Sequence, residues 1–181
     1  MRFTETPLKG SYLIDLELKG DERGFFARLF CEKEFALQSL NTHWVQINNS
    51  YTNVKGTVRG LHFQYPPYME VKMVRCTKGQ IWDVVIDIRK DSETFGKSFS
   101  CELSEINRRM LYIPVGFAHG FQTMSDDVEL LYFHSCHFSK SHEGGINPID
   151  PTFGINWPLP VHNLSDRDSS HPFLTESFKG I

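Results

Sequence analysis

The chain has 181 residues, of which 40% are hydrophobic and 23% are charged, and this composition predicts one globular domain over residues 1–181. Its formal net charge of −3 lacks the basic surplus of a nucleic-acid-binding protein, so we expect no nucleic-acid partner. No apolar run has the length of about 18 residues that a membrane span needs, and the first residues do not look like a secretory signal. We therefore expect a cytoplasmic location without a membrane partner. The four cysteines form no CxxC pair and are expected as free, buried thiols: Cys31, Cys76, Cys101 and Cys136.

Most of the chain has the pattern of short β-strands separated by turns. Apolar and polar side chains alternate in residues 11–19, and residues 21–30 open with a turn before three phenylalanines. Residues 71–89 carry two apolar runs, which predict two strands joined by a turn at Lys78-Gly79. Closely spaced turns between such strands are typical of a sandwich or closed barrel, so we predict an all-β fold. Further strand-like segments cover residues 96–104, 109–116 and 128–138.

Two segments have the pattern of short helices. Residues 32–41 show helical spacing at Phe35, Leu37 and Leu40, which predicts a helix near the N-terminus. The tail from Ser165 onward starts with a capping residue and predicts one helical turn.

Two spaced histidine motifs narrow the class of barrel. Gly56 precedes His62 by six positions, and Pro114, Gly116 and His119 follow much later as Pro-x-Gly-x2-His. These spacings resemble the skeleton of the two cupin motifs. The resemblance implies a cupin-like jelly-roll β-barrel with a few short helices and with both histidines facing its mouth.

A metal-binding cupin would normally place a second histidine where this chain has Gln64. The nearest glutamate, Glu70, lies six residues further on, beyond Pro66-Pro67. Two imidazoles and a glutamine are a poor ligand set for a transition metal, so we expect no metal there. Two alternatives stay open: a metal-dependent oxygenase using His62, Gln64, Glu70 and His119, and a non-catalytic sugar-binding cupin.

Eleven short segments occur in the order and spacing of one enzyme family: DERGFF, QIN, GTVRGLHFQ, VKMVRC, GQIWDVVIDIR, TFG, IPVGFAHGF, ELLY, HEGGI, INWP and LSDRD. Over about residues 3–175 the chain resembles the dTDP-4-dehydrorhamnose 3,5-epimerases. This implies cofactor-independent epimerisation at C3 and C5 of a nucleotide-linked 4-keto-6-deoxyhexose, of the type dTDP-4-dehydro-6-deoxyglucose to dTDP-4-dehydrorhamnose. It also implies a homodimer in which the N-terminal strand of a partner completes the site. An epimerase acting at one carbon only, on a dTDP- or CDP-4-keto sugar, stays open.

The resemblance implies four catalytic residues. His62 is the base, because an imidazole accepts and releases protons near neutral pH. Asp168 in the LSDRD segment pairs with this histidine and supports its charged form, with Asp166 as a competing candidate. Tyr132 is the acid on the opposite face of the sugar. Lys72 faces the keto oxygen, where enolate charge develops.

The resemblance also implies the residues that bind substrate. Asp83 is expected to hold Lys72 or a histidine in place. Phe138 stands where the family commonly has a tyrosine that stacks on the nucleotide base, and its ring keeps that flat face. Two departures, Arg28 in place of a glutamate and the segment GGINPID, put the exact sugar and nucleotide in question. The complete expected binding set is Arg23, Phe26, Gln46, Asn48, Arg59, His119, Phe138, Glu143 and Arg167.

Overall fold

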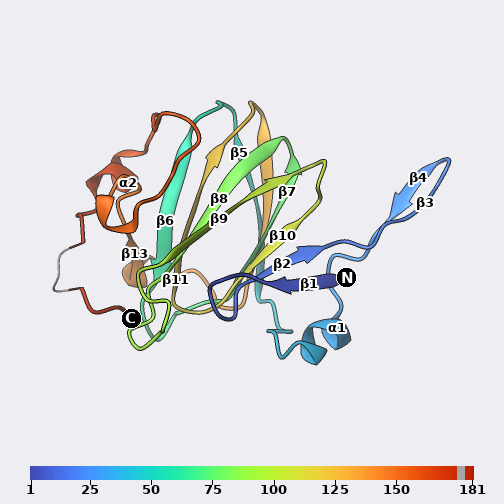
Figure 1. Cartoon of the computed structure of the whole chain (residues 1–181), viewed down its shortest axis with the longest axis horizontal. Coiled ribbons are helices and arrows are strands. Elements are labelled where there is room, and N and C mark those ends of the chain that lie inside the picture. Colours follow the sequence, from blue (N-terminus) through green and yellow to red (C-terminus); the bar gives the residue numbers. More distant parts are fainter. Residues whose placement is uncertain (175–177) are drawn as a thin grey trace.

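The computed structural model describes residues 1–174 and 178–181, and Figure 1 shows two sheets facing each other. Every strand pair within the sheets is antiparallel. The larger sheet has the order β1 (Arg2–Glu5), β2 (Tyr12–Asp15), β10 (Met110–Ile113), β7 (Lys72–Lys78), β12 (Val128–His134) and β5 (Gln46–Thr52). The second has the order β13 (Glu143–Gly145), β6 (Val58–Gln64), β11 (Phe117–Thr123), β8 (Gln80–Asp87) and β9 (Ser98–Ser104).

The main hydrophobic core lies between the inner faces of these two sheets. Side chains point alternately to the two faces of a strand, so every second residue of the central strands enters this core. Val74 and Leu130 of the larger sheet pack against Ile81, Val85 and Phe121 of the smaller one, all nearly inaccessible to solvent. The arrangement is a jelly-roll sandwich, as predicted.

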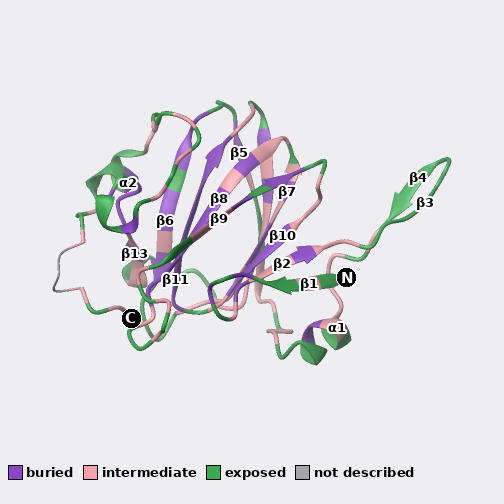
Figure 2. Ribbon diagram, viewed as in Figure 1, coloured by how far each residue is buried: buried purple, intermediate pink, exposed green. Residues whose placement is uncertain are grey.

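Both outer faces are also covered. The helix α1 (Glu32–Leu37) places Phe35 against Met73 and Met110 on the outside of the larger sheet. On the other side, residues within 146–174 and 178–181 cover the smaller sheet with a second cluster that includes Phe153. Figure 2 shows that most of the buried residues belong to the central strands. The strands are therefore buried on both faces, which explains their nearly continuous apolar runs.

The predicted elements are found with shorter bounds. The turn at Lys78-Gly79 joins β7 to β8, but these strands belong to different sheets and do not pair. The predicted N-terminal helix exists, and Phe35 is its buried residue, but Leu37 is 82% exposed and its assignment to the apolar face was wrong. The tail forms α2 (Asp166–Ser170), and the Ser165 hydroxyl accepts a hydrogen bond from the amide of residue 168, as the capping prediction requires.

Residues 19–26 do not join either large sheet. The strands β3 (Lys19–Asp21) and β4 (Gly24–Phe26) form a separate hairpin that projects from the barrel in Figure 1. Phe25 and Phe26 are 49% and 71% exposed. An apolar hairpin with this exposure is typical of a surface that contacts another molecule.

The remaining sequence expectations concern the thiols and the membrane. All four cysteines are free, with Cys76 and Cys101 buried and Cys31 and Cys136 half-buried. Among the described residues, no helix combines the length and apolar character that crossing a membrane requires.

A glycine sets the close approach of the two histidine-bearing strands. Gly60 of β6 has φ +115°, and a Cβ added there would lie 2.6 Å from the Cα of Gly120 in β11. Only glycine suits both the backbone conformation and this contact. The same strand pair places His62 directly opposite His119 in the sheet register.

Candidate active site

One open cavity of about 610 Å³ lies between the two sheets, within the size range of small-molecule sites. The strands β5, β7 and β12 supply one wall, and β6 and β11 supply the other. Eight of the predicted site residues line it: Asn48, Arg59, His62, Lys72, His119, Tyr132, Phe138 and Glu143.

The histidine predicted as the base has the predicted carboxylate partner. The Nε2 atom of His62 lies 2.7 Å from Oδ1 of Asp168, although 106 residues separate them. The other oxygen of Asp168 accepts a hydrogen bond from the backbone amide of Gly60 at 3.2 Å. Asp166 is exposed in the same helix, so the competing assignment is not supported by the geometry.

The environment favours a neutral His62 beside an ionised Asp168. Burial lowers the pKa of His62, assisted by the positive charges of Arg167 and Lys72, and this outweighs the upward effect of Asp168. Burial alone would raise the pKa of Asp168, but its hydrogen bond with His62, reinforced by the Gly60 amide, lowers that pKa to about 2. A neutral imidazole held by a carboxylate can accept a proton and then be stabilised as an imidazolium.

Arg167 connects the pair of His62 and Asp168, called the dyad below, to the rim of the cavity. Its guanidinium donates to Glu143 at 2.9 Å and lies 2.7 Å from Nε2 of His62. The Arg167 side chain is 51% exposed. It therefore pairs with Glu143 at the surface while adding positive charge beside the imidazole.

The predicted acid lies across the cavity from the dyad, on the other sheet. Tyr132 on β12 lies edge-on to His119, with ring centroids 6.2 Å apart. Burial, with a contribution from the charge of Asp83, raises the pKa of Tyr132 well above its usual value. The phenol therefore keeps its proton over the ordinary pH range and can donate it. Asp83 was expected to hold Lys72 or a histidine in place. In the structure its Oδ1 lies 2.8 Å from Nε2 of His119.

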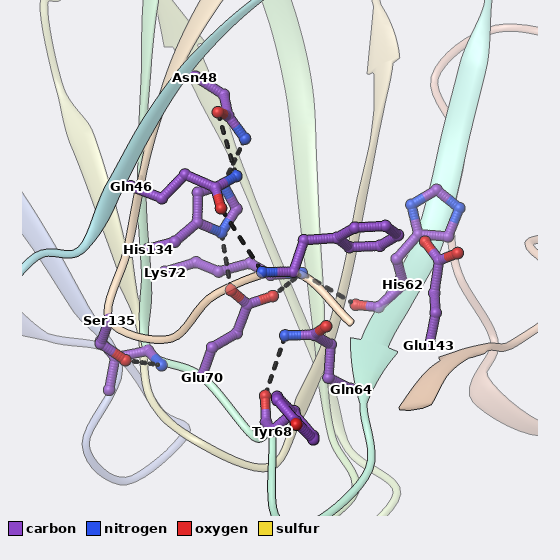
Figure 3. A network of polar contacts seen from close by, with 12 residues as sticks. Gln46, Asn48, His62, Gln64, Tyr68, Glu70, Lys72, His134, Ser135 and Glu143 are labelled. Carbon is purple, nitrogen blue, oxygen red and sulfur yellow. Dashed lines mark hydrogen bonds and ion pairs between the residues drawn. The ribbon is translucent and has the colours of Figure 1, made fainter. Parts of the chain in front are cut away.

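Lys72 belongs to a polar network on the floor of the cavity (Figure 3). Its Nζ lies 3.3 Å from Oε1 of Glu70 and 3.4 Å from the carbonyl oxygen of His62. The other oxygen of Glu70 lies 2.7 Å from Nδ1 of His134. Burial disfavours the charged form of Glu70, but its contacts with His134 and Lys72 prevail and lower its pKa. The network therefore fixes a lysine cation inside the cavity.

Glu70 and His134 were not predicted as parts of this network. His134 lies two residues after Tyr132, on the same face of β12, and the two rings stack 6.0 Å apart. The alternation of a strand could have suggested His134, since residues i and i+2 share a face. No local motif links it to Glu70, which is 64 residues away.

The residues of the oxygenase alternative have other partners. The Gln64 amide donates to the backbone oxygen of Tyr68 at 2.9 Å, and its carbonyl accepts from the Ser139 amide at 2.7 Å. Glu70 pairs with Lys72 and His134, and His119 pairs with Asp83. In the described part of the chain, His62, Glu70 and His119 do not form one cluster of metal-ligand atoms. The geometry gives this alternative no support.

Two predicted binding residues lie away from the cavity. Arg23 pairs with Asp21 at 2.6 Å in the projecting hairpin, and with Phe26 it lines a separate shallow hollow. Arg28 forms an ion pair with Glu34 of α1 at 2.7 Å. Gln46, by contrast, lies beside the cavity, where its side-chain amide donates to the Asn48 side chain at 3.2 Å.

A jelly-roll barrel whose mouth holds histidines from these two motifs is the architecture of the cupin-fold enzymes. The family model of dTDP-4-dehydrorhamnose 3,5-epimerase matches residues 5–176. An enzyme of that description from Sinorhizobium fredii is 45% identical, covering 87% of this chain and 81% of its own length. The chain belongs to the dTDP-4-dehydrorhamnose 3,5-epimerase family, which makes it a sugar-nucleotide epimerase.

Solved structures agree with this assignment. The dTDP-4-dehydrorhamnose 3,5-epimerase from Elizabethkingia anophelis superposes with a TM-score of 0.93 at 38% identity, over 98% of both chains. The enzyme from Bacillus anthracis, solved with TDP and pyrophosphate bound, gives 0.93 at 37% identity, over 96% of this chain and 99% of its own. A dTDP-4-dehydrorhamnose 3-epimerase from Streptomyces niveus is also similar, at 33% identity over 98% of this chain and 86% of its own length.

Proposed function

We propose that this enzyme epimerises a dTDP-linked 4-keto-6-deoxyhexose at both C3 and C5, without a metal or redox cofactor. The observation that carries the proposal is that His62, paired with Asp168, and Tyr132 line one cavity from opposite sheets, and that Lys72 lines the same cavity. Inversion of a carbon needs a base on one face and an acid on the other, and this placement supplies both.

His62 removes the proton from the carbon next to the C4 ketone, and Asp168 stabilises the imidazolium that results. The electrons of the broken C–H bond form an enolate whose negative charge develops on the ketone oxygen. Lys72 stabilises that oxygen, because a fixed cation in a partly buried cavity costs no reorganisation during the reaction. Tyr132 then protonates the same carbon from the opposite face.

The diphosphate and base of the substrate extend towards the rim. Arg59 lines the cavity and suits phosphate oxygens, with Arg167 at the dyad edge as a second cation. The ring of Phe138 is 57% exposed at the same rim, where it is free to stack on a nucleotide base. The related Bacillus anthracis structure contains TDP, which supports the choice of a thymidine nucleotide.

The projecting hairpin suggests that the active form is a homodimer. Arg23 and Phe26 are exposed and line no part of their own cavity. We assign them to the cavity of a partner chain, where an arginine and an aromatic ring would close the substrate site.

The experiment follows solvent deuterium into the sugar by NMR, using 4-keto-6-deoxyhexoses linked to dTDP and to CDP. Double epimerisation incorporates label at both C3 and C5 of the dTDP sugar. Label at only one carbon identifies a single-centre epimerase, and faster turnover of the CDP sugar overturns the nucleotide assignment. The 3-epimerase relative makes this comparison necessary.

A further inference from the structure

A third polar side chain, that of His171, lies beside the dyad and has no part in the proposed reaction. His171 follows α2, and ligand atoms of His62, Asp168 and His171 all lie within 4.8 Å of one another. The rings of His62 and His171 meet edge-on with centroids 6.4 Å apart. Two imidazoles and a carboxylate are a ligand set suited to zinc and similar divalent ions.

The ring of His171 packs directly against β13. A Cβ added to Gly145 would lie 2.1 Å from Nε2 of His171, so the ring occupies the space that a larger residue in β13 would fill. The backbone oxygen of His171 also accepts a hydrogen bond from the Asn147 side chain at 3.0 Å. Gly145 pairs directly with His62 in the sheet register, which brings the two histidines together.

His171 also has a buried nitrogen without a partner. Its Nε2 atom is inaccessible to solvent and makes no hydrogen bond with any described residue. A buried polar atom in this state costs free energy, whereas a bound ion would satisfy it. This observation is independent of the spacing of the three side chains.

We infer that His62, Asp168 and His171 form a binding site for a divalent transition-metal ion such as Zn²⁺, and that the bound ion inhibits the enzyme. Zinc holds histidine nitrogen and carboxylate oxygen at about 2.0–2.2 Å, so small rotations of the three side chains bring their atoms around one ion. With one ring nitrogen bound to the ion and the other protonated, neutral His62 has no lone pair left to accept a proton from the sugar. The inhibition rests on the proposed function, whereas the binding does not.

One positively charged side chain must move before a cation can bind at this site. Arg167 opposes the ion, since its guanidinium lies 2.7 Å from Nε2 of His62. Its half-exposed side chain can turn away while it stays paired with Glu143 at the surface.

The test is a calorimetric titration of the chelator-treated enzyme with ZnCl₂ in the absence of substrate. We expect one ion per chain, a parallel loss of epimerase turnover and full recovery with EDTA. No binding, or binding without loss of turnover, would overturn the inference. Deuterium exchange by the metal-free enzyme tests the proposed function separately, so the two failures are distinguishable.

The matched variants are His171→Asn and His162→Asn. The ring of His162 also packs against a glycine, since its Nε2 lies 2.3 Å from a Cβ added to Gly56. His162 does not belong to the group of three proposed ligands. Loss of a second-layer residue typically weakens metal binding by about 10- to 100-fold, so loss of a ligand should cost at least tenfold. We expect this loss in His171→Asn only, and equal affinities of the two variants would refute the site.

A measurement on the parent enzyme covers the case in which His171→Asn fails to fold. Zinc should shift the histidine ring NMR resonances of His62 and His171 and leave that of His162 in place. Shifts confined to other histidines would show that the ion binds elsewhere and would overturn the assignment.

Discussion

In the proposed mechanism, proton transfer depends on the charge states of His62 and Asp168. Burial and two neighbouring cations lower the pKa of the imidazole, while the carboxylate opposes that shift. The carboxylate itself is held ionised with a pKa of about 2. In the proposed mechanism the pair therefore starts the reaction as a neutral imidazole beside a carboxylate, and we expect the rate to depend on pH accordingly.

The acid limb of the kcat/KM profile should lie below the ordinary histidine pKa of about 6.5. If His62 is the base, turnover needs its neutral form and is lost as the pH falls through its pKa, which burial lowers. Asp168→Asn removes the group that raises this pKa, so the limb should move to still lower pH. The rate should also fall by about 10²-fold or more, the usual contribution of acid–base catalysis.

Asp166→Asn is the matched control, because Asp166 is an exposed carboxylate in the same short helix. Its profile should coincide with that of the parent. An acid limb that moves upward in Asp168→Asn would contradict the charge distribution described for the dyad.

The sequence was informative about single residues where a motif marked them. The resemblance paired His62 with Asp168 across 106 residues, and the structure contains that contact. Glu70, His134 and His171 were not assigned to the active-site networks, because each acquires its partners only through strand pairing or packing of the tail. Such contacts depend on tertiary structure, and no local spacing encodes them.

Among the elements, α1 shows how one side chain attaches a short helix to the barrel. Phe35 is fully buried and packs edge-on against Phe3, with ring centroids 5.3 Å apart. A six-residue helix has little stability of its own, so this packing holds it in place. The sequence placed the helix correctly, but three apolar residues in a short turn could not all face the sheet, and Leu37 faces solvent.

Phe35→Ala should lower the free energy of unfolding by about 3–5 kcal/mol, the usual cost of emptying a buried phenylalanine site. Leu37→Ala, two residues away and exposed, should change it by less than about 0.5 kcal/mol. Urea denaturation followed by tryptophan fluorescence measures both. Similar losses in the two variants would contradict the packing of the outer face.

At the level of the whole molecule, the projecting hairpin is the feature that the barrel alone does not explain. The strand patterns predicted the barrel because its core needs alternating or continuous apolar runs. They did not predict that residues 19–26 leave it, because an exposed apolar hairpin and a core strand have the same local pattern. Our proposal that the hairpin completes a partner's cavity accounts for the exposed ring of Phe26, whereas Phe25 packs under the guanidinium of Arg108 in its own chain.

A mixed dimer tests this exchange between chains. Arg23→Ala and His62→Ala homodimers should both be slow, each for its own reason. A heterodimer of the two variants can be purified through two different tags. In one of its two sites, His62 of the Arg23→Ala chain meets Arg23 of the His62→Ala chain, so that site should work. The heterodimer should therefore show about half the parent's turnover. Turnover no higher than the average of the two homodimers would place Arg23 in its own chain's site.

The most direct test of the opposed base and acid is the fate of the substrate hydrogens in deuterated water, measured by NMR for the parent, His62→Ala and Tyr132→Phe. If the imidazole and the phenol act on opposite faces, Tyr132→Phe should still exchange hydrogen next to the ketone but return it with the original configuration. His62→Ala should lose exchange and inversion together, with nucleotide binding nearly unchanged. Inversion by Tyr132→Phe at the parental rate, or exchange by His62→Ala within about tenfold of the parent, would contradict the account.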